Sequence, residues 1–209
     1  MGIAGSDFKT VLQTLKRVGF LMETDASLPS VSGLIARETV SGSWWSHKAA
    51  QRIFSTLGQL EDHRDVIFTK LISGKVTIVH RKLWSEIFSL GTSHAPWQLN
   101  DLSKPARALF DKVNKQGSLR TDQLDWPKAE KAKPGDMART LEKKILVHTE
   151  QFHTEGGAHA KLLESWETWA KRIDFKPELI SPEESQRKIE EIVKRLNHQF
   201  KASASLPWS

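Results

Sequence analysis

The sequence predicts a mainly helical α+β protein. Apolar residues recur every three or four positions in several segments, which is the spacing of amphipathic helices. Two other segments place strand-forming residues on both sides of a turn, at Ser73-Gly74 and at Gly156-Gly157, which favours two β-hairpins. A chain of 209 residues can form one large domain or two small ones. We expect an N-terminal lobe at residues 1–92, a second domain at 101–170, and a C-terminal helix and tail at 171–209.

The N-terminal lobe is predicted to contain two amphipathic helices. The first starts after Asp7, a residue type that caps helices, and stops before Gly19. The second starts after Ser46 and ends near Asp62. Residues 23–43 mix turn formers with apolar residues, so we expect turns with at most one short helix or strand there. The two apolar stripes are Phe8, Val11, Leu12, Leu15 and Val18, then Ala50, Ile53, Phe54, Leu57 and Leu60.

A hairpin is predicted to complete this lobe. Its strands are residues 66–72 and 75–80, which are rich in β-branched side chains, and a tight turn at Ser73-Gly74 joins them. Another helix starts at Leu83. Residues 91–100, with the sequence GTSHAPWQLN, carry turn formers and few apolar residues, so we expect the linker between the lobes there.

The segment after this linker has the order of elements that is typical of a winged helix-turn-helix. A helix starts at Ser103 and ends at Gly117, and residues 119–124 form a very short second element. A third helix opens at residues 134–136 and has the amphipathic pattern of a recognition helix. The turn at residues 154–157 contains two glycines and joins the strands of the wing.

Two helices and a tail are predicted to end the chain. Leu162, Leu163, Trp166, Trp169 and Ala170 form the stripe of the first helix. The sequence Ser181-Pro182-Glu183-Glu184 is a capping box that starts the second helix. We expect the last residues, KASASLPWS, to be a loosely held tail.

Composition and charge limit the classes of function. The N-terminus lacks the features of a secretory signal, and no stretch approaches the roughly 18 apolar residues of a membrane span. The chain has no cysteine, which excludes disulfides, thiolate metal sites and cysteine nucleophiles. No phosphate-binding loop or hydrolase motif is present. We therefore expect a soluble, cytoplasmic protein that does not contact a membrane and needs no cofactor. The sequence indicates no oligomeric state.

Basic residues favour a partner that carries phosphate. The formal net charge is +6, the sign expected of a protein that binds nucleic acid. Around the third helix, the residues that could hold DNA phosphates are Lys131, Lys133, Arg139, Lys143 and Lys144. In the first hairpin they are Lys70, Lys75, Arg81 and Lys82. Two alternatives are open: the winged helix is a scaffold for protein contacts, and the charged hairpin only prevents strand aggregation.

Aromatic and polar clusters give two further expectations. Trp44 and Trp45 could stack on bases, but core packing is the interpretation that we favour. His148, His153 and His159 surround the second hairpin together with two glutamates. Strand alternation puts His148, Glu150 and Phe152 on one face and Gln151 and His153 on the other. Their spacing matches no compact metal signature, so we expect hydrogen-bonded wing residues and no metal.

Three segments, GSWWSH, TKLISGKVTIVHRKLW and HTEGGAHAKLLESW, together with the winged-helix pattern, resemble a bacterial branch related to AlkZ-type DNA glycosylases. Those enzymes are built from winged-helix repeats and excise alkylated bases, so the resemblance implies a DNA-associated role with a link to DNA damage. They carry a Gln-x-Gln or similar catalytic pair. The nearest match here is Gln151-Phe152-His153, which departs at the second polar position. If base excision occurred, the candidates for activating water would be Glu150, Gln151, His153 and Glu155.

We therefore predict a non-catalytic winged-helix protein that binds duplex DNA through its third helix and wing. The first alternative is a base-excision enzyme that resembles a DNA glycosylase. The second is a winged-helix scaffold for protein interactions.

Overall fold

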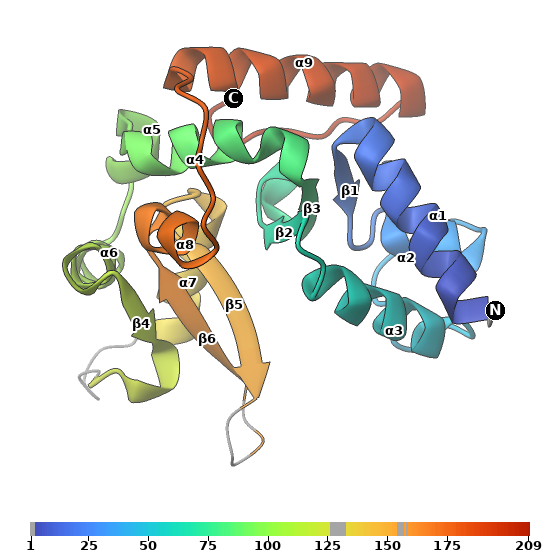
Figure 1. Ribbon diagram of the computed structural model, residues 1–209, viewed down its shortest axis with the longest axis horizontal. Helices are drawn as coiled ribbons and strands as arrows, with labels where there is room; N and C mark the ends of the chain where they lie inside the picture. Colours follow the sequence, from blue (N-terminus) through green and yellow to red (C-terminus); the bar gives the residue numbers. More distant parts are fainter. Residues whose placement is uncertain (1–2, 126–132, 154–156, 158) are drawn as a thin grey trace. The chain divides into compact units, whose positions relative to one another are not determined.

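The structure is a computed structural model that describes residues 3–125, 133–153, 157 and 159–209 (Figure 1). It is mixed α+β and mainly helical, with two antiparallel sheets of three strands each, which confirms the predicted class. The chain divides into two compact units. Unit 1 comprises Met1–Trp84 and Arg187–Leu206, and unit 2 comprises Ser85–Gln186 and Pro207–Ser209. No helix among the described residues is long and apolar enough to cross a membrane.

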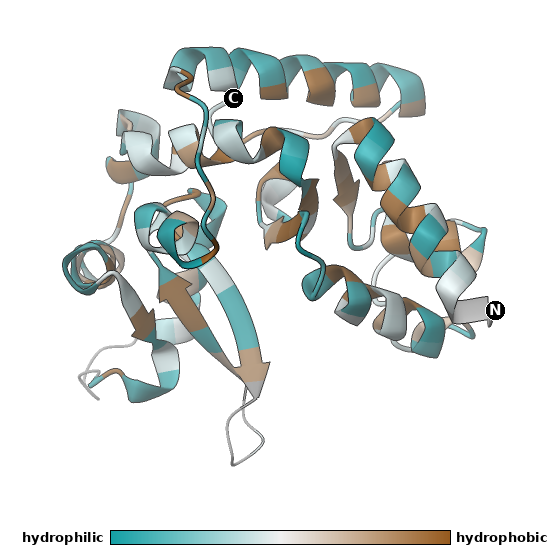
Figure 2. Cartoon of the chain, viewed as in Figure 1, coloured by the Kyte–Doolittle hydropathy of each residue, from teal (hydrophilic) through white to brown (hydrophobic). Residues whose placement is uncertain are grey.

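Unit 1 is a small sheet covered by helices. Its first elements are α1 (Ile3–Val18), β1 (Phe20–Met22), α2 (Val31–Ala36) and α3 (Ala50–Glu61). They are followed by β2 (Val66–Thr69), the short helix η1 (Ile72–Gly74), β3 (Thr77–His80) and η2 (Arg81–Leu83). The sheet order is β1-β3-β2, and both pairings are antiparallel. The apolar stripes of α1 and α3 agree with the structure, and Figure 2 shows hydrophilic and hydrophobic patches along α1. Both expected caps are wrong, because Asp7 lies inside α1, which begins at Ile3, and the N-cap of α3 is Ala49.

Two local features of unit 1 differ from the prediction. The strand β1 was not expected, and it pairs with β3 in the register Phe20↔Val79. The turn of the hairpin is also longer than a tight two-residue turn, because Thr69 pairs with Thr77 and η1 occupies the connection. Ser73 in this connection has a φ of 51° and accepts the backbone N–H of Ser205 on its side-chain oxygen.

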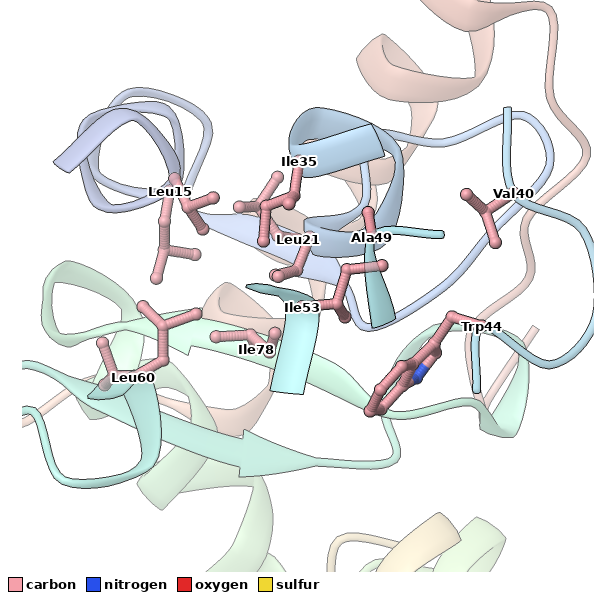
Figure 3. Close-up of a cluster of buried hydrophobic side chains, with 12 residues drawn as sticks. Leu15, Leu21, Ile35, Val40, Trp44, Ala49, Ile53, Leu60 and Ile78 are labelled. Atoms are coloured by element: carbon pink, nitrogen blue, oxygen red, sulfur yellow. The ribbon is translucent and has the colours of Figure 1, made fainter. Parts of the chain in front are cut away.

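The core of unit 1 collects side chains from every layer (Figure 3). Leu15 of α1, Leu21 of β1, Ile53 of α3 and Ile78 of β3 are all at most 1% exposed. Trp44 belongs to the same cluster, and its Nε1 donates a hydrogen bond of 2.7 Å to Glu23 Oε1. The preference for core packing is therefore confirmed for Trp44. Trp45, in contrast, is 65% exposed, although its ring stacks on that of Trp44.

Unit 2 contains the second sheet. After α4 (Trp84–Ser93), which starts at the last residue of unit 1, come α5 (Pro96–Leu99), α6 (Lys104–Gln116), β4 (Ser118–Arg120) and η3 (Thr121–Gln123). The chain continues with α7 (Pro134–Lys143), β5 (His148–His153), β6 (His159–Glu164) and α8 (Trp166–Arg172). The sheet order is β4-β6-β5, again antiparallel. Leu109, Phe110 and Val113 of α6 pack with Leu141 of α7 and Leu163 of β6 in one buried cluster.

The segment expected to be a linker is instead packed structure. Gly91 lies in α4 and is buried, because its missing side chain makes room for the ring of Trp166. A Cβ at Gly91 would lie 2.1 Å from Trp166 Cδ1. Gln98 of α5 is fully buried, and its amide bonds the backbone oxygens of Leu90 and Lys144. The turn-forming residues of this segment therefore lie at a close packing contact and at helix ends.

The last helix, α9 (Pro182–Phe200), starts at the predicted capping box. Glu184 N donates to Ser181 Oγ, and Ser181 N donates to Glu184 Oε2. The expectation of a loosely held tail is wrong, because Ala204 and Ser205, after α9, are hydrogen-bonded within unit 1. Asn197 exchanges two hydrogen bonds with Ala204, and Ser73 N donates to Ser205 O at 2.8 Å.

Candidate functional site

The helix α7 presents a basic face to solvent. Its apolar side carries Ala138 and Leu141, which are fully buried against α6 and β6. Arg139 and Lys143 are exposed on the other side, and Lys133 is exposed at the N-cap. Arg139 Nη1 lies 3.8 Å from Asp136 Oδ1, with both side chains more than half exposed, so this pair holds the arginine only weakly.

The other two cations expected beside α7, Lys144 and Lys131, are not on this exposed face as the structure describes it. Lys144 is only partly exposed, because its Nζ donates a hydrogen bond of 2.7 Å to Trp97 O. Its distance to Asp101 Oδ2 is 3.9 Å. Lys144 therefore links α7 to α5. Lys131 lies outside the described residues.

The cations of the first hairpin are mostly engaged within unit 1. Lys75 Nζ is 2.7 Å from Asp25 Oδ2, and Arg81 Nη1 is 3.7 Å from Asp65 Oδ1. Lys82 Nζ donates to the oxygens of Lys16 and Arg17, the last turn of α1. Burial lowers the pKa of Lys82, and the charges of Arg195 and Lys188 lower it further. Lys70 is half-buried and also has an interaction partner.

The sheet of unit 2 has two distinct faces. Directly paired residues of antiparallel strands share a face, so the pair His148↔Glu164 lies opposite to the pair Thr149↔Leu163. Leu163 is fully buried with α6 and α7, which assigns the second face to those helices. The predicted alternation along β5 is thereby confirmed: His148, Glu150 and Phe152 share the face away from α7.

A buried carboxylate connects α7 to the sheet. Glu142 is 6% exposed, and its Oε2 is 2.5 Å from Lys161 Nζ of β6. Its Oε1 accepts a hydrogen bond from the hydroxyl of Thr149 on β5. The only carboxylate in the second half of α7 thus points inward, and its charge is balanced there.

The opposite face holds a charged cluster. Glu164 is 2% exposed and receives two hydrogen bonds from Arg172, Nε to Oε1 at 2.9 Å and Nη2 to Oε2 at 2.6 Å. The same guanidinium binds Glu150. Burial by itself raises the pKa of Glu164, but contacts with His148 and Arg172 outweigh it, so the pKa is lowered. The hydrogen bonds that Arg172 donates to Glu164 and Glu150 raise the pKa of Arg172.

His148 lies beside this cluster in an aromatic pocket. It is 5% exposed, and its ring centroid is 5.7 Å from that of Trp166 and 5.3 Å from that of Trp169. Its Nδ1 is 3.5 Å from Glu164 Oε2, at the outer limit of a hydrogen bond, and has no other partner among the described residues. The arginine is therefore the firmer partner of Glu164.

His148, Glu150 and Glu164 also have the donor types of a metal site. One ligand atom from each lies within 4.8 Å of the other two. Both carboxylates, however, already bond the guanidinium of Arg172, so a cation of the protein balances their charge. A metal ion would have to displace this arginine. The geometry supports a structural ion-pair network.

Of the four catalytic candidates, the structure describes the side chains of Glu150 and Gln151, and these two do not come together. Glu150 and Gln151 point to opposite faces of β5, and Glu150 is paired with Arg172. His153 is the last residue of β5, and its side chain is not among those that the structure describes. Glu155 lies outside the described residues. Hydrogen-bonded networks form instead around Glu142 with Lys161 and around Glu164 with Arg172, residues that no sequence motif indicated. Their pairing depends on the register of the strands and on the helix α8 that follows β6, and neither is visible as a local sequence motif.

The chain matches the family model described as AlkZ related over residues 6–205, and it belongs to that family. No curated protein and no solved structure gives a significant match. The family assignment suggests a DNA-associated role and confirms the resemblance seen in the three sequence segments.

Proposed function

We propose that this protein binds duplex DNA through a winged helix in unit 2, with α7 as the recognition helix and the β5–β6 hairpin as the wing. The observation that carries the proposal is the combination of element order and sheet order. The order α6, β4, η3, α7, β5, β6, with the sheet β4-β6-β5, is that expected of a helix-turn-helix followed by a wing. Membership in the AlkZ-related family supports the DNA partner.

The charges of α7 suit a phosphate backbone. Arg139 and Lys143 are exposed, while Glu142 is buried and neutralised by Lys161, so it does not oppose an anionic ligand. Lys133 adds a cation at the start of the helix, where side chains of recognition helices approach bases. The first hairpin would contribute less, because Lys75, Arg81 and Lys82 are engaged inside unit 1.

Fluorescence anisotropy with a labelled duplex tests the proposal. We expect the full chain to bind duplex DNA at low salt and to lose affinity steeply as salt rises. The double variant R139A/K143A should weaken binding about tenfold or more, since each removes a phosphate contact. The matched control is K171A/K176A, which removes the same charge from α8 and the segment after it. Equal affinity of the two double variants would refute the role of α7 and favour a protein-interaction scaffold.

Base excision is the second candidate function, and family membership favours it. It predicts that the protein releases free base from alkylated duplex DNA and that Gln151→Ala abolishes the release. Glu150→Ala is the second variant to measure. Glu150 lies on the opposite face of β5 and is paired with Arg172, so this variant tests whether that face takes part in the release. Absence of released base from alkylated DNA that the protein does bind would leave the non-catalytic proposal in place.

A further inference from the structure

A second candidate binding site lies in unit 1, apart from the residues used above. It is a pocket of about 660 Å³ between α1, the segment 25–30, α2 with the residues just after it, and the C-terminal half of α9. Pockets for small molecules commonly have volumes of about 300 to 1,000 Å³, so the size fits a compact ligand. All the elements that line it belong to the same compact unit.

Three arginines line this pocket: Arg17 of α1, Arg37 at the end of α2 and Arg195 of α9. All three are exposed to solvent. Among the described residues, no carboxylate pairs with any of them, and their guanidinium groups form no hydrogen bonds. This contrasts with Arg52, Arg120 and Arg172, each of which binds a carboxylate through the guanidinium. Guanidinium groups without protein partners are free to bind an anion.

The two carboxylates of the pocket do not neutralise these arginines. Asp25 binds Lys75 Nζ at 2.7 Å and accepts the backbone N–H groups of Ser27 and Leu28. Glu38 binds Lys48 Nζ and His47 Nε2, both at 3.1 Å. Hydrogen bonds from Lys48 and His47 lower the pKa of Glu38, so it stays ionised while already paired. The pocket therefore keeps a positive excess of three arginine charges.

The rest of the lining mixes polar and apolar side chains. Leu28, Leu34, Leu196 and Phe200 contribute to it, and Phe200 is 37% exposed at the end of α9. A site that combined free guanidinium groups with an open aromatic ring would recognise both an anion and a flat apolar body. Inorganic phosphate alone would use only the first of these features.

The backbone around Arg37 holds this residue at the pocket. Arg37 has a φ of 60° and ends α2, and its N–H donates to Gly33 O at 2.9 Å. Residues other than glycine, asparagine and aspartate adopt such a positive φ only rarely. The start of α2 is also capped, because Gly33 N donates a hydrogen bond to Ser30 Oγ. The segment that carries Arg37 is thus determined locally and does not depend on a ligand.

We propose that this pocket binds a small phosphate monoester with a flat apolar body, of the size of a nucleoside monophosphate. Arg17, Arg37 and Arg195 contact the phosphate, and Phe200 with the neighbouring leucines packs on the flat part. The proposal is independent of DNA binding by unit 2, because none of its residues belongs to α7 or the wing.

Calorimetric titration of the full chain at low ionic strength tests the proposal, with adenosine monophosphate, adenosine and inorganic phosphate as probes. We expect adenosine monophosphate to bind and the other two to bind at least tenfold more weakly. R17A/R195A should weaken the monophosphate at least tenfold, since charge-assisted hydrogen bonds are lost. The matched control K9A/K194A removes the same charge from the same two helices at positions outside the pocket, and it should change affinity less than twofold.

Three results would overturn the proposal. The first is no heat of binding for the monophosphate at millimolar concentration. The second is an equal loss of affinity in both double variants, which would indicate attraction to net charge alone. The third is binding of inorganic phosphate as tightly as of the monophosphate. Because the substituted side chains are exposed, a thermal melt that matches the wild type ensures that the variants are folded.

Discussion

Arg172, the last residue of α8, holds the buried carboxylate of Glu164 at the end of β6 through two hydrogen bonds of 2.9 and 2.6 Å. The pair fastens α8 to the sheet that carries the proposed wing. Glu164 is 2% exposed, so its charge depends on this partner. A buried carboxylate that loses its partner destabilises a protein strongly, because no water replaces the lost bonds.

Arg172→Ala is expected to lower the free energy of unfolding by about 2 to 3 kcal/mol. Chemical denaturation followed by tryptophan fluorescence measures this, since Trp166 and Trp169 lie next to the cluster. Lys171→Ala is the matched control and should change the value by less than about 0.5 kcal/mol, as is usual for exposed positions. If both variants unfolded alike, the ion pair would have no structural role.

The lowered pKa of Glu164 predicts a loss of stability in acid. A carboxyl whose pKa is lower in the folded state than in the unfolded state stabilises the fold above its unfolded pKa. This contribution is lost as the pH falls from the usual value of 4.5 through the lower folded value. Between pH 6 and roughly pH 3, the free energy of unfolding should therefore fall more steeply in the wild type than in Glu164→Gln, whose side chain cannot titrate. An equal fall in the two proteins would contradict the lowered pKa of Glu164.

Gly91→Ala is expected to destabilise unit 2 by about 1 to 3 kcal/mol, because the added Cβ collides with the ring of Trp166. Trp166 cannot move freely, since its Nε1 donates a buried hydrogen bond of 2.7 Å to Ile145 O. Gly58→Ala is the comparison: it lies inside α3, a Cβ there meets nothing within 4 Å, and the change should stabilise by about 0.5 to 1 kcal/mol. Thermal unfolding separates the two, and a neutral Gly91→Ala would contradict the packing described here.

Much of the fold follows from local pattern in the sequence. The positions of α1, α3, α6, α7 and α9 agree with their apolar stripes, and Ser103 and Ser181 cap α6 and α9 as expected, since both signals act over one or two turns. The caps expected at Asp7 and Ser46 were wrong. Gly91 could not be interpreted in this way. Its role depends on Trp166, 75 positions later, and a glycine beside a turn-rich segment also predicts a loop.

The candidate site was less predictable than the fold. Exposure of Arg139 and Lys143 follows from the periodicity of α7, but the engagement of Lys144 by Trp97 does not. Glu164 and Arg172 were not selected, because their importance comes from the register of β5 against β6 and from the turn into α8. The charges of the first hairpin were counted correctly, yet their pairing with Asp25 and Asp65 depends on tertiary contacts.

The salt dependence of DNA binding is the most direct test of DNA recognition through α7. Each phosphate contact adds about 0.9 to the negative slope of log affinity against log salt. We expect R139A/K143A to lower the magnitude of the slope by about 2 and K171A/K176A to leave it unchanged. A slope that R139A/K143A does not alter, or that both double variants lower equally, would contradict recognition of DNA through α7.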